Sequence, residues 1–363
     1  MMLKRGVLLM LALLLMLLPL TVQKADARQS PSSLMESFRQ ASETYKVPLP
    51  LLMAIGYAET RWNHHDGQPS QLNGYGIMHL VDNPRHHTLQ QAAQLTRFSE
   101  ERLKQDSHAN IMGAAAVLAH IAKEQGEGRL PDRLGKWYPV AAEYAGYQSQ
   151  MITRLHVDEV FRLIREGVSK QAEGERLELK ATRVLPDRGI YEHVQLSNTL
   201  PAYDYPNARW IPADSSNYNA ANREGDGNDI DKVVIHTTQG SYAGAISWFQ
   251  NPSSNVSAHY VIRSSDGEIT QMVQDSDIAW HAGNWDYNVH SIGIEHEGYV
   301  EEPGWYTDSM YRSSAALTRW LCDQYEIPRD RSHIIGHSEV PGATHTDPGS
   351  QWDWNYYMSL VNQ

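Results

Sequence analysis

The chain has 363 residues, 41% hydrophobic and 20% charged; this composition excludes a disordered or fibrous protein and is long enough for two separate cores. Its formal net charge of −12 excludes a general nucleic-acid binder, because phosphates repel an acidic surface and no local basic patch offsets it. The only cysteine, Cys322, excludes an internal disulfide, and its place beside Leu321 in an apolar-periodic stretch predicts a core residue.

The N-terminus carries the features of a secretory signal peptide, which we expect to span residues 1–27. Lys4 and Arg5 precede an apolar run, and a small-x-small pattern, Ala25-Asp26-Ala27, follows it. An uncleaved anchor is the alternative, but the run is short for a bilayer and contains Pro19. We therefore expect a secreted or otherwise extracytoplasmic protein, in the cell wall or periplasm, without stable membrane association after cleavage.

Residues 31–167 predict an all-α domain, because apolar residues recur at helical spacing and no alternating strand pattern competes. Ser33 and Glu36 form a capping-box pattern at the start of the first helix, and Pro48 and Pro50 open the second. The predicted elements are a helix from Leu34, a helix from Leu51 to Arg61, a turn at Gly74–Leu80, and helices at Asn110–Lys123 and Val157–Glu166.

Glu59 follows the apolar helix Leu51–Ala58, so its carboxyl is expected to emerge at the helix end beside packed side chains. Burial there raises a carboxyl pKa and favours a general acid, whereas the ordinary alternative is a solvated terminal charge. The order of four segments resembles the lysozyme-like domain of lytic transglycosylases over about residues 33–167. These segments are Ala54-Ile55-Gly56-Tyr57-Ala58-Glu59-Thr60, Gly74-Tyr75-Gly76-Ile77-Met78-His79, Asn110 through Leu118, and Ala141-Ala142-Glu143-Tyr144-Ala145-Gly146.

This resemblance implies that Glu59 is the lone acid/base that cleaves glycan between N-acetylmuramic acid and N-acetylglucosamine. The substrate's own acetamido group then assists, so no second carboxylate is required. Three positions depart from the family pattern: Thr60 replaces a serine, His79 replaces a glutamine, and Glu143–Gly146 lacks an asparagine. Two hypotheses for the domain follow: it cleaves glycan, or it binds glycan without cleaving it.

Residues 168–205 are charged and mixed in composition and predict a linker or a brief packed extension. The remaining residues, 206–363, predict an α/β domain in which helices cover one mixed sheet. The expected strands are Lys232–His236, a hairpin of His259–Ile262 with Ile269–Val273, and Ser291–Glu295; the expected helices are Tyr242–Gln250, Asp308–Tyr325 and Trp352–Leu360.

A Gly- and Pro-rich loop, Gly336–Gly349, contains His337, His345 and Asp347 within eleven residues. Imidazole and carboxylate groups are ligands that Zn²⁺ accepts, and a hydrolytic zinc needs three protein ligands and one open position. His236, at the end of a predicted buried strand, is a candidate for a ligand from outside the loop, although a lone histidine there is more often an ordinary polar residue.

Five segments occur in the order found in zinc-dependent N-acetylmuramoyl-L-alanine amidases, and the stretch Trp210–Val361 resembles the branch shared with phage lysozyme-type amidases and peptidoglycan recognition proteins. The resemblance implies that His236, His337 and Asp347 bind Zn²⁺, and that Glu295 moves the proton of the attacking water. The segments are Val234-Ile235-His236-Thr237-Thr238, Ser257-Ala258-His259-Tyr260, Ala279-Trp280-His281-Ala282-Gly283, Ser291-Ile292-Gly293-Ile294-Glu295, and Gly336-His337 through Thr346-Asp347-Pro348-Gly349.

His345 stands where some relatives carry a lysine that steadies the oxyanion, so we expect it to do the same as a cation or N–H donor. A supporting role, or a role as an alternative ligand, is the other possibility. His259 and His281 match cleft positions of the family and are expected to contact substrate, with hydrogen-bonded structural histidines as the ordinary alternative. Trp280 is expected to stack on sugar or peptide, with core packing as the alternative.

Together these patterns predict a monomeric, exported, two-domain peptidoglycan hydrolase that binds glycan strand and stem peptide and removes the stem peptide. The competing class is a peptidoglycan-binding or sensing protein whose N-terminal module holds glycan without turnover. All three candidate ligands and Glu295 are present, which favours the enzyme. A cross-link metallopeptidase is disfavoured because the chain has no H-E-x-x-H helix.

Overall fold

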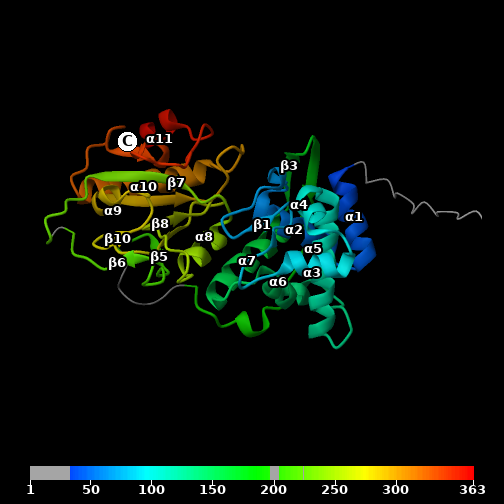
Figure 1. Ribbon diagram of the computed structural model, residues 1–363. Coiled ribbons are helices and arrows are strands. Elements are labelled where there is room, and N and C mark those ends of the chain that lie inside the picture. Colours follow the sequence, from blue (N-terminus) through cyan, green and yellow to red (C-terminus); the bar gives the residue numbers. More distant parts are fainter. Residues whose placement is uncertain (1–32, 197–203, 224) are drawn as a thin grey trace, which may run out of the picture.

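The computed structural model describes residues 33–196, 204–223 and 225–363, so the signal peptide predicted for residues 1–27 lies outside the described residues. Within these ranges no helix combines the length and the apolar character needed to cross a bilayer. Figure 1 shows a helical unit beside an α/β unit, with α7 and α8 at the boundary between them. This arrangement confirms the expected fold class of an all-α domain followed by a mixed-sheet domain.

The helical unit is built from short helices around α5, a long and largely buried helix rich in alanine. The N-cap half of the predicted capping box is present, because the Ser33 hydroxyl accepts the Glu36 N–H at the start of α1. The elements are α1 (Leu34–Tyr45), α2 (Leu49–Thr60), η1 (His65–Gly67), β1 (Gly74–Tyr75), β2 (Leu80–Val81), α3 (Thr88–Thr96), α4 (Glu100–Gln105), α5 (Ser107–Gln125), η2 (Leu134–Trp137), α6 (Tyr138–Ala145) and α7 (Gln150–Glu166).

Asn110 of α5, whose side chain is fully buried, holds the glycine turn between β1 and β2 in place by hydrogen bonds. Its amide donates to the carbonyl oxygens of Tyr75 and Leu103 and accepts the N–H of Met78. Gly76 has φ +66°, and a Cβ there would lie 2.4 Å from the Asn110 amide nitrogen, so only glycine fits. This contact sets the position of His79 at the end of the turn.

The sequence predicted either a linker or a brief packed extension for residues 168–205. Residues 168–179, at the start of this segment, form a packed extension. The antiparallel strands β3 (Val168–Ala172) and β4 (Glu175–Leu179) pair there, and Leu177 and Leu179 are buried in the core of the helical unit. A 3₁₀ turn, η3 (Gly189–Tyr191), follows.

The α/β unit contains a six-stranded mixed sheet in the order β12-β7-β11-β8-β9-β5. Strands β12, β7, β11 and β8 are parallel, and β8 and β9 form the predicted hairpin. The elements are β5 (Ala208–Trp210), β6 (Tyr218–Asn219), β7 (Lys232–Thr237), α8 (Tyr242–Phe249), β8 (Tyr260–Ile262), β9 (Ile269–Gln271), β10 (Ile278–Ala279), α9 (Trp285–His290), β11 (Ser291–His296), α10 (Asp308–Gln324), β12 (Ile334–Gly336), η4 (His337–Glu339) and α11 (Trp354–Val361).

The sheet brings the carboxyl ends of β7, β11 and β12 to one edge, where parallel α/β sheets hold their sites. His236 of β7 is the register partner of Glu295 of β11, and His337 directly follows β12. Glu295 and His337, which follow His236 in the chain by about sixty and about a hundred residues, therefore lie beside it at this edge.

The two units share one apolar core across their boundary. Ile152 and Leu155 of α7 pack in the same buried cluster as Ile246 and Phe249 of α8. Arg61, at the end of α2 and only 7% exposed, crosses the boundary: its guanidinium donates to the Ser264 hydroxyl at 2.5 Å and to the Gly304 carbonyl. A buried cation held this way fixes the relative position of the two units, since moving them apart would break its hydrogen bonds.

Asp275, a fully buried carboxyl beneath the sheet, makes stability depend on pH. Burial, followed by the charge of Asp204, raises the pKa of Asp275 to about 7, although the hydroxyls of Tyr260 and Tyr325 donate to it. An unfolded aspartate releases its proton near pH 4, so between about pH 4 and 7 the folded chain holds a proton that the unfolded chain has lost. Stability therefore falls as pH rises through this window, by up to about 1.4 kcal/mol per pH unit.

We expect Asp275→Asn, which does not titrate, to remove this slope. Urea unfolding at pH 5, 6 and 7 measures it, with exposed Asp286→Asn as the control. Parallel stability curves for the parent and Asp275→Asn would contradict the assignment.

Candidate active site

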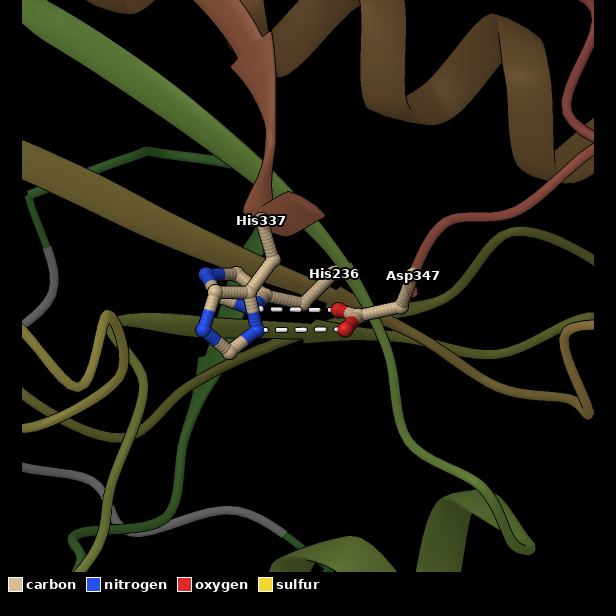
Figure 2. Close-up of side chains that lie close together, drawn as sticks. All are labelled: His236, His337 and Asp347. Atoms are coloured by element: carbon tan, nitrogen blue, oxygen red, sulfur yellow. Dashed lines mark ion pairs between the residues drawn. The ribbon is translucent and has the colours of Figure 1, made fainter. Parts of the chain in front are cut away.

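Three buried side chains, His236, His337 and Asp347, converge at the carboxyl edge of the sheet, with exposed fractions of 2, 6 and 6%. Figure 2 shows both imidazoles facing the carboxylate. The Nδ1 atom of His236 lies 3.3 Å from one oxygen of Asp347, and the Nδ1 atom of His337 lies 3.1 Å from the other. One ligand atom from each residue fits within a 4.8 Å span, so the three groups can hold one metal ion.

The protonation states of these groups suit a cation. Burial alone would raise the pKa of Asp347, but hydrogen bonds from His236 and His337 outweigh it and hold the pKa well below the usual range. Burial lowers the pKa of His236, which keeps its ring neutral. The Nε2 atom of His337 is buried without a hydrogen-bond partner among the described residues. Within the described part of the chain the cluster consists of one carboxylate and two imidazoles, which is the donor set of a hydrolytic zinc site with an open position.

Glu295 is the penultimate residue of the neighbouring strand β11 and lines the same pocket. Its Oε2 atom is buried and has no hydrogen-bond partner among the described residues. Burial, followed by the charge of Asp347, raises the pKa of this carboxyl well above its ordinary value. A carboxyl of this kind, beside a group of metal ligands, is placed to accept and return a proton.

The two cleft histidines have different surroundings. The Nδ1 atom of His281 lies 2.9 Å from Nε2 of His236, so His281 orients a candidate ligand and also lines the pocket. His259 is fully buried: its Nδ1 accepts the Gly293 N–H, and its Nε2 lies 3.1 Å from the guanidinium of Arg223. His259 is absent from the pocket lining, so its position supports the sheet rather than the substrate contact expected for it.

The pocket holds about 450 Å³, within the range typical of ligand sites. Trp280 lines it, and its indole N–H donates to Asn219 at 2.7 Å, which leaves the ring face as its contact surface. His345 lines it as well and is exposed at its rim, stacked on His337 with ring centroids 4.8 Å apart. His345 is therefore beside the candidate ligands without forming part of the cluster.

Glu59 lies at the end of α2 as predicted, but it faces the α/β unit and is only 4% exposed. One carboxylate oxygen lies 3.1 Å from Nε2 of His156, and the other accepts the Ser241 hydroxyl at 3.2 Å. His79 approaches that second oxygen at 3.6 Å. Because Ser241 caps α8 of the other unit, Glu59 is enclosed in the boundary between the units rather than open to an outside ligand.

Sequence reasoning gave no role to His156 or Ser241. His156 lies on the buried face of α7. A histidine among the apolar residues Ile152, Leu155 and Val160 is the feature of the sequence that could have indicated a buried polar site. Ser241 shows only the ordinary pattern of a helix N-cap, and nothing local connects it with Glu59. The pocket wall formed by Pro69, Ser70 and Gln71 of the helical unit was also missed, because loop residues carry no signal of what they face across a boundary.

Two families match the chain, one in each unit. Residues 226–350 match the N-acetylmuramoyl-L-alanine amidase family, and residues 36–155 match the family described as the transglycosylase SLT domain. N-acetylmuramoyl-L-alanine amidase A of Achromobacter lyticus is 42% identical over 178 residues, which cover 44% of this chain and 97% of that relative. The candidate ligands and Glu295 fall inside the first match, and Glu59 falls inside the second.

Two further similarities concern the α/β unit. The 1,6-anhydro-N-acetylmuramyl-L-alanine amidase AmpD of Haemophilus influenzae is 41% identical over 113 residues, covering 29% of this chain and 59% of AmpD. The crystal structure of a selenomethionine AmpD derivative is 30% identical and covers 43% of this chain and 96% of that chain, with a TM-score of 0.36.

Proposed function

The chain belongs to the N-acetylmuramoyl-L-alanine amidase family, and we propose that the pocket around His236, His337 and Asp347 hydrolyses the amide between the lactyl group of N-acetylmuramic acid and the L-alanine of the stem peptide. The observation that carries this proposal is the buried three-ligand cluster with the unpartnered Glu295 oxygen at the same sheet edge. The best-suited metal is Zn²⁺, since two imidazoles and one carboxylate with an open position match its preference.

The residues divide the reaction between them. When bound, Zn²⁺ supplies Lewis acidity that polarises the amide carbonyl and makes water more acidic. Glu295 accepts the proton of the attacking water and returns it to the amide nitrogen. The carbon–nitrogen bond breaks, the lactyl group stays on the muramic acid as a carboxylate, and the stem peptide departs with a free amine. His281 holds the ring of His236 in orientation, and Trp280 offers its ring face to the substrate.

Mass spectrometry of digested peptidoglycan tests this function. We expect the parent protein to release free stem peptides and to contain one zinc per chain. A pure binding or sensing role is not favoured, because the three candidate ligands and Glu295 are all present. Protein without zinc that releases no peptide would support that role instead.

The location and partners follow from the substrate. Peptidoglycan lies outside the cytoplasm, and the signal peptide predicted at residues 1–27 supports export. The three ligands and Glu295 come from a single chain, which supports action as a monomer.

Glycan cleavage by the helical unit is a second candidate function, favoured by the family match at residues 36–155 and by the pairing of Glu59 with His156. In the arrangement described here both oxygens of Glu59 are occupied, so cleavage requires α8 to move away from it. Anhydromuramic ends that disappear in Glu59→Gln would support this activity. Equal numbers of such ends in both digests would exclude Glu59 as their source.

We propose that His345 stabilises the oxyanion that develops at the amide carbonyl. His345→Gln is expected to lower kcat by about 10- to 100-fold with little change in KM, because an oxyanion donor acts mainly in the transition state. His333→Gln, outside the pocket, is the control. A kcat of His345→Gln equal to that of the parent would contradict the role.

A further inference from the structure

Tyr306 lies beside the candidate active site and bridges two segments that carry its ligands. The Tyr306 hydroxyl donates to the Pro348 carbonyl at 2.8 Å and lies 2.8 Å from the Thr237 hydroxyl. Pro348 directly follows Asp347 in the chain, and Thr237 directly follows His236. One hydroxyl group therefore ties the segment next to one candidate ligand to the segment next to another.

The donors in this bridge can be assigned from its chemistry. A tyrosine hydroxyl carries one proton, and here it goes to the Pro348 carbonyl, which can only accept. The Thr237 hydroxyl must then donate to Tyr306. Phenylalanine would remove both hydrogen bonds but keep the packing of the ring, because the contacts with Tyr311 and Trp352 do not involve the hydroxyl.

Thr237 also contacts a candidate ligand directly. Its backbone N–H donates to Oδ2 of Asp347 at 3.2 Å. This is the same oxygen that lies 3.3 Å from Nδ1 of His236. The position of Thr237 thus sets how the carboxylate is turned toward the imidazole. Hydrogen bonds of this kind orient the ligands of a metal site and strengthen its hold on the ion.

The segment on both sides of Tyr306 is held by Ser264, in the turn between β8 and β9. The Ser264 hydroxyl donates to the Trp305 carbonyl, and the Thr307 hydroxyl donates to the Ser264 carbonyl. Both Ser264 and Trp305 are buried. The two neighbours of Tyr306 in the chain are therefore attached to one buried serine.

Arg61 of the helical unit reaches the same serine across the boundary. Its guanidinium donates to the Ser264 hydroxyl and to the Gly304 carbonyl. Its Cζ atom lies 4.0 Å from the centre of the Trp305 ring, which adds a cation–π attraction. Gly304 and Trp305 immediately precede Tyr306, so a cation of one unit holds the segment that positions this hydroxyl in the other.

We propose, on the basis of the amidase function proposed above, that Tyr306 is a positioning residue of the metal centre and that Arg61 acts through it by fixing Gly304 and Trp305. Tyr306 is not among the described residues that line the metal pocket, so it acts on the ligands and not on the substrate. The affinity for zinc, and with it the amidase activity, then depends on a contact between the two units.

The test measures the affinity of each purified variant for Zn²⁺ alone by competition with a chelator, and then peptide release in excess zinc. We expect Tyr306→Phe to bind Zn²⁺ about 10- to 100-fold more weakly than the parent, because a hydrogen bond that supports the ligands is lost. Arg61→Met should weaken binding less, by about threefold to tenfold, because it only loosens the segment that carries the hydroxyl. Excess zinc should restore most of the activity of both variants.

The double variant distinguishes a route through Tyr306 from two independent effects. If Arg61 acts through the hydroxyl, Arg61→Met should cause no further loss of zinc affinity in a Tyr306→Phe background. Losses that multiply in the double variant would overturn the role of Arg61, and parent affinity in Tyr306→Phe would overturn the role of Tyr306. Arg61→Lys, which keeps the charge but not the two-pronged contact, should fall between the parent and Arg61→Met and replaces the latter if it does not fold.

Tyr356→Phe and Arg39→Met are the matched controls. Tyr356 loses a hydroxyl contact with Asp308, and the Arg39 side chain is 57% exposed; neither residue is among those that line the metal pocket. Both variants should bind zinc like the parent, and losses equal to those of Tyr306→Phe would overturn the inference. A parent that binds zinc but releases no stem peptide would overturn the proposed function while leaving the zinc comparison intact. Thermal unfolding of each metal-free variant separates weaker zinc binding from misfolding.

Discussion

Asp347→Asn is expected to lose its bound zinc and to lower the amidase rate by about 10³-fold or more, since a Lewis-acid metal contributes several kcal/mol to the transition state. The carboxylate supplies the only negative charge of the three-ligand cluster and faces both His236 and His337. Asparagine has nearly the same shape as aspartate, but it carries no negative charge, so the two imidazoles alone bind a cation much more weakly. Elemental analysis and peptide release measure the two losses.

The control for this change is Asp286→Asn, because the Asp286 side chain is 82% exposed. That variant should keep both its zinc and its activity. Full zinc occupancy in Asp347→Asn would remove Asp347 from the set of ligands. A chelator should reproduce the loss of activity in the parent, and added zinc should restore it.

Glu295→Gln is expected to lower kcat by about 10²- to 10⁴-fold while the zinc content stays at the parent level. Glutamine has nearly the same shape, but it cannot accept the proton of the attacking water or return it to the leaving nitrogen. The unpartnered Oε2 atom of Glu295 is the group lost. Loss of activity with metal retained separates this role from that of a ligand.

Glu301→Gln, at an exposed glutamate that follows the same strand, is the matched control and should behave like the parent. Two results would contradict the assignment. Free stem peptides released at the parent rate by Glu295→Gln would exclude Glu295 as the proton carrier, and loss of zinc in that variant would make it a ligand instead.

Glu59 lies at the boundary between the two units. Residues 36–155 of the helical unit match the transglycosylase SLT domain family, and the Glu59 carboxylate accepts the hydroxyl of Ser241 in the α/β unit. Residues Pro69–Gln71 of the same helical unit form a wall of the amidase pocket. Arg61 and a shared apolar core hold the two units together at this boundary.

The fold class and the elements that carry the site can be predicted from local features of the sequence. These features are the cap at Ser33, the buried strand that carries His236, and the spacing of His337 and Asp347 in one loop. Capping, apolar periodicity and the order of motifs act over short stretches of chain, so they can be recognised without knowing what the stretches contact.

The packing of the two units sets which polar groups meet across the boundary. It encloses Glu59 with His156 and Ser241, and it places His259 inside the sheet and His281 beside His236. These outcomes depend on how α7 packs against α8. The buried face of a helix is apparent from its sequence, but the identity of the surface that it covers is not.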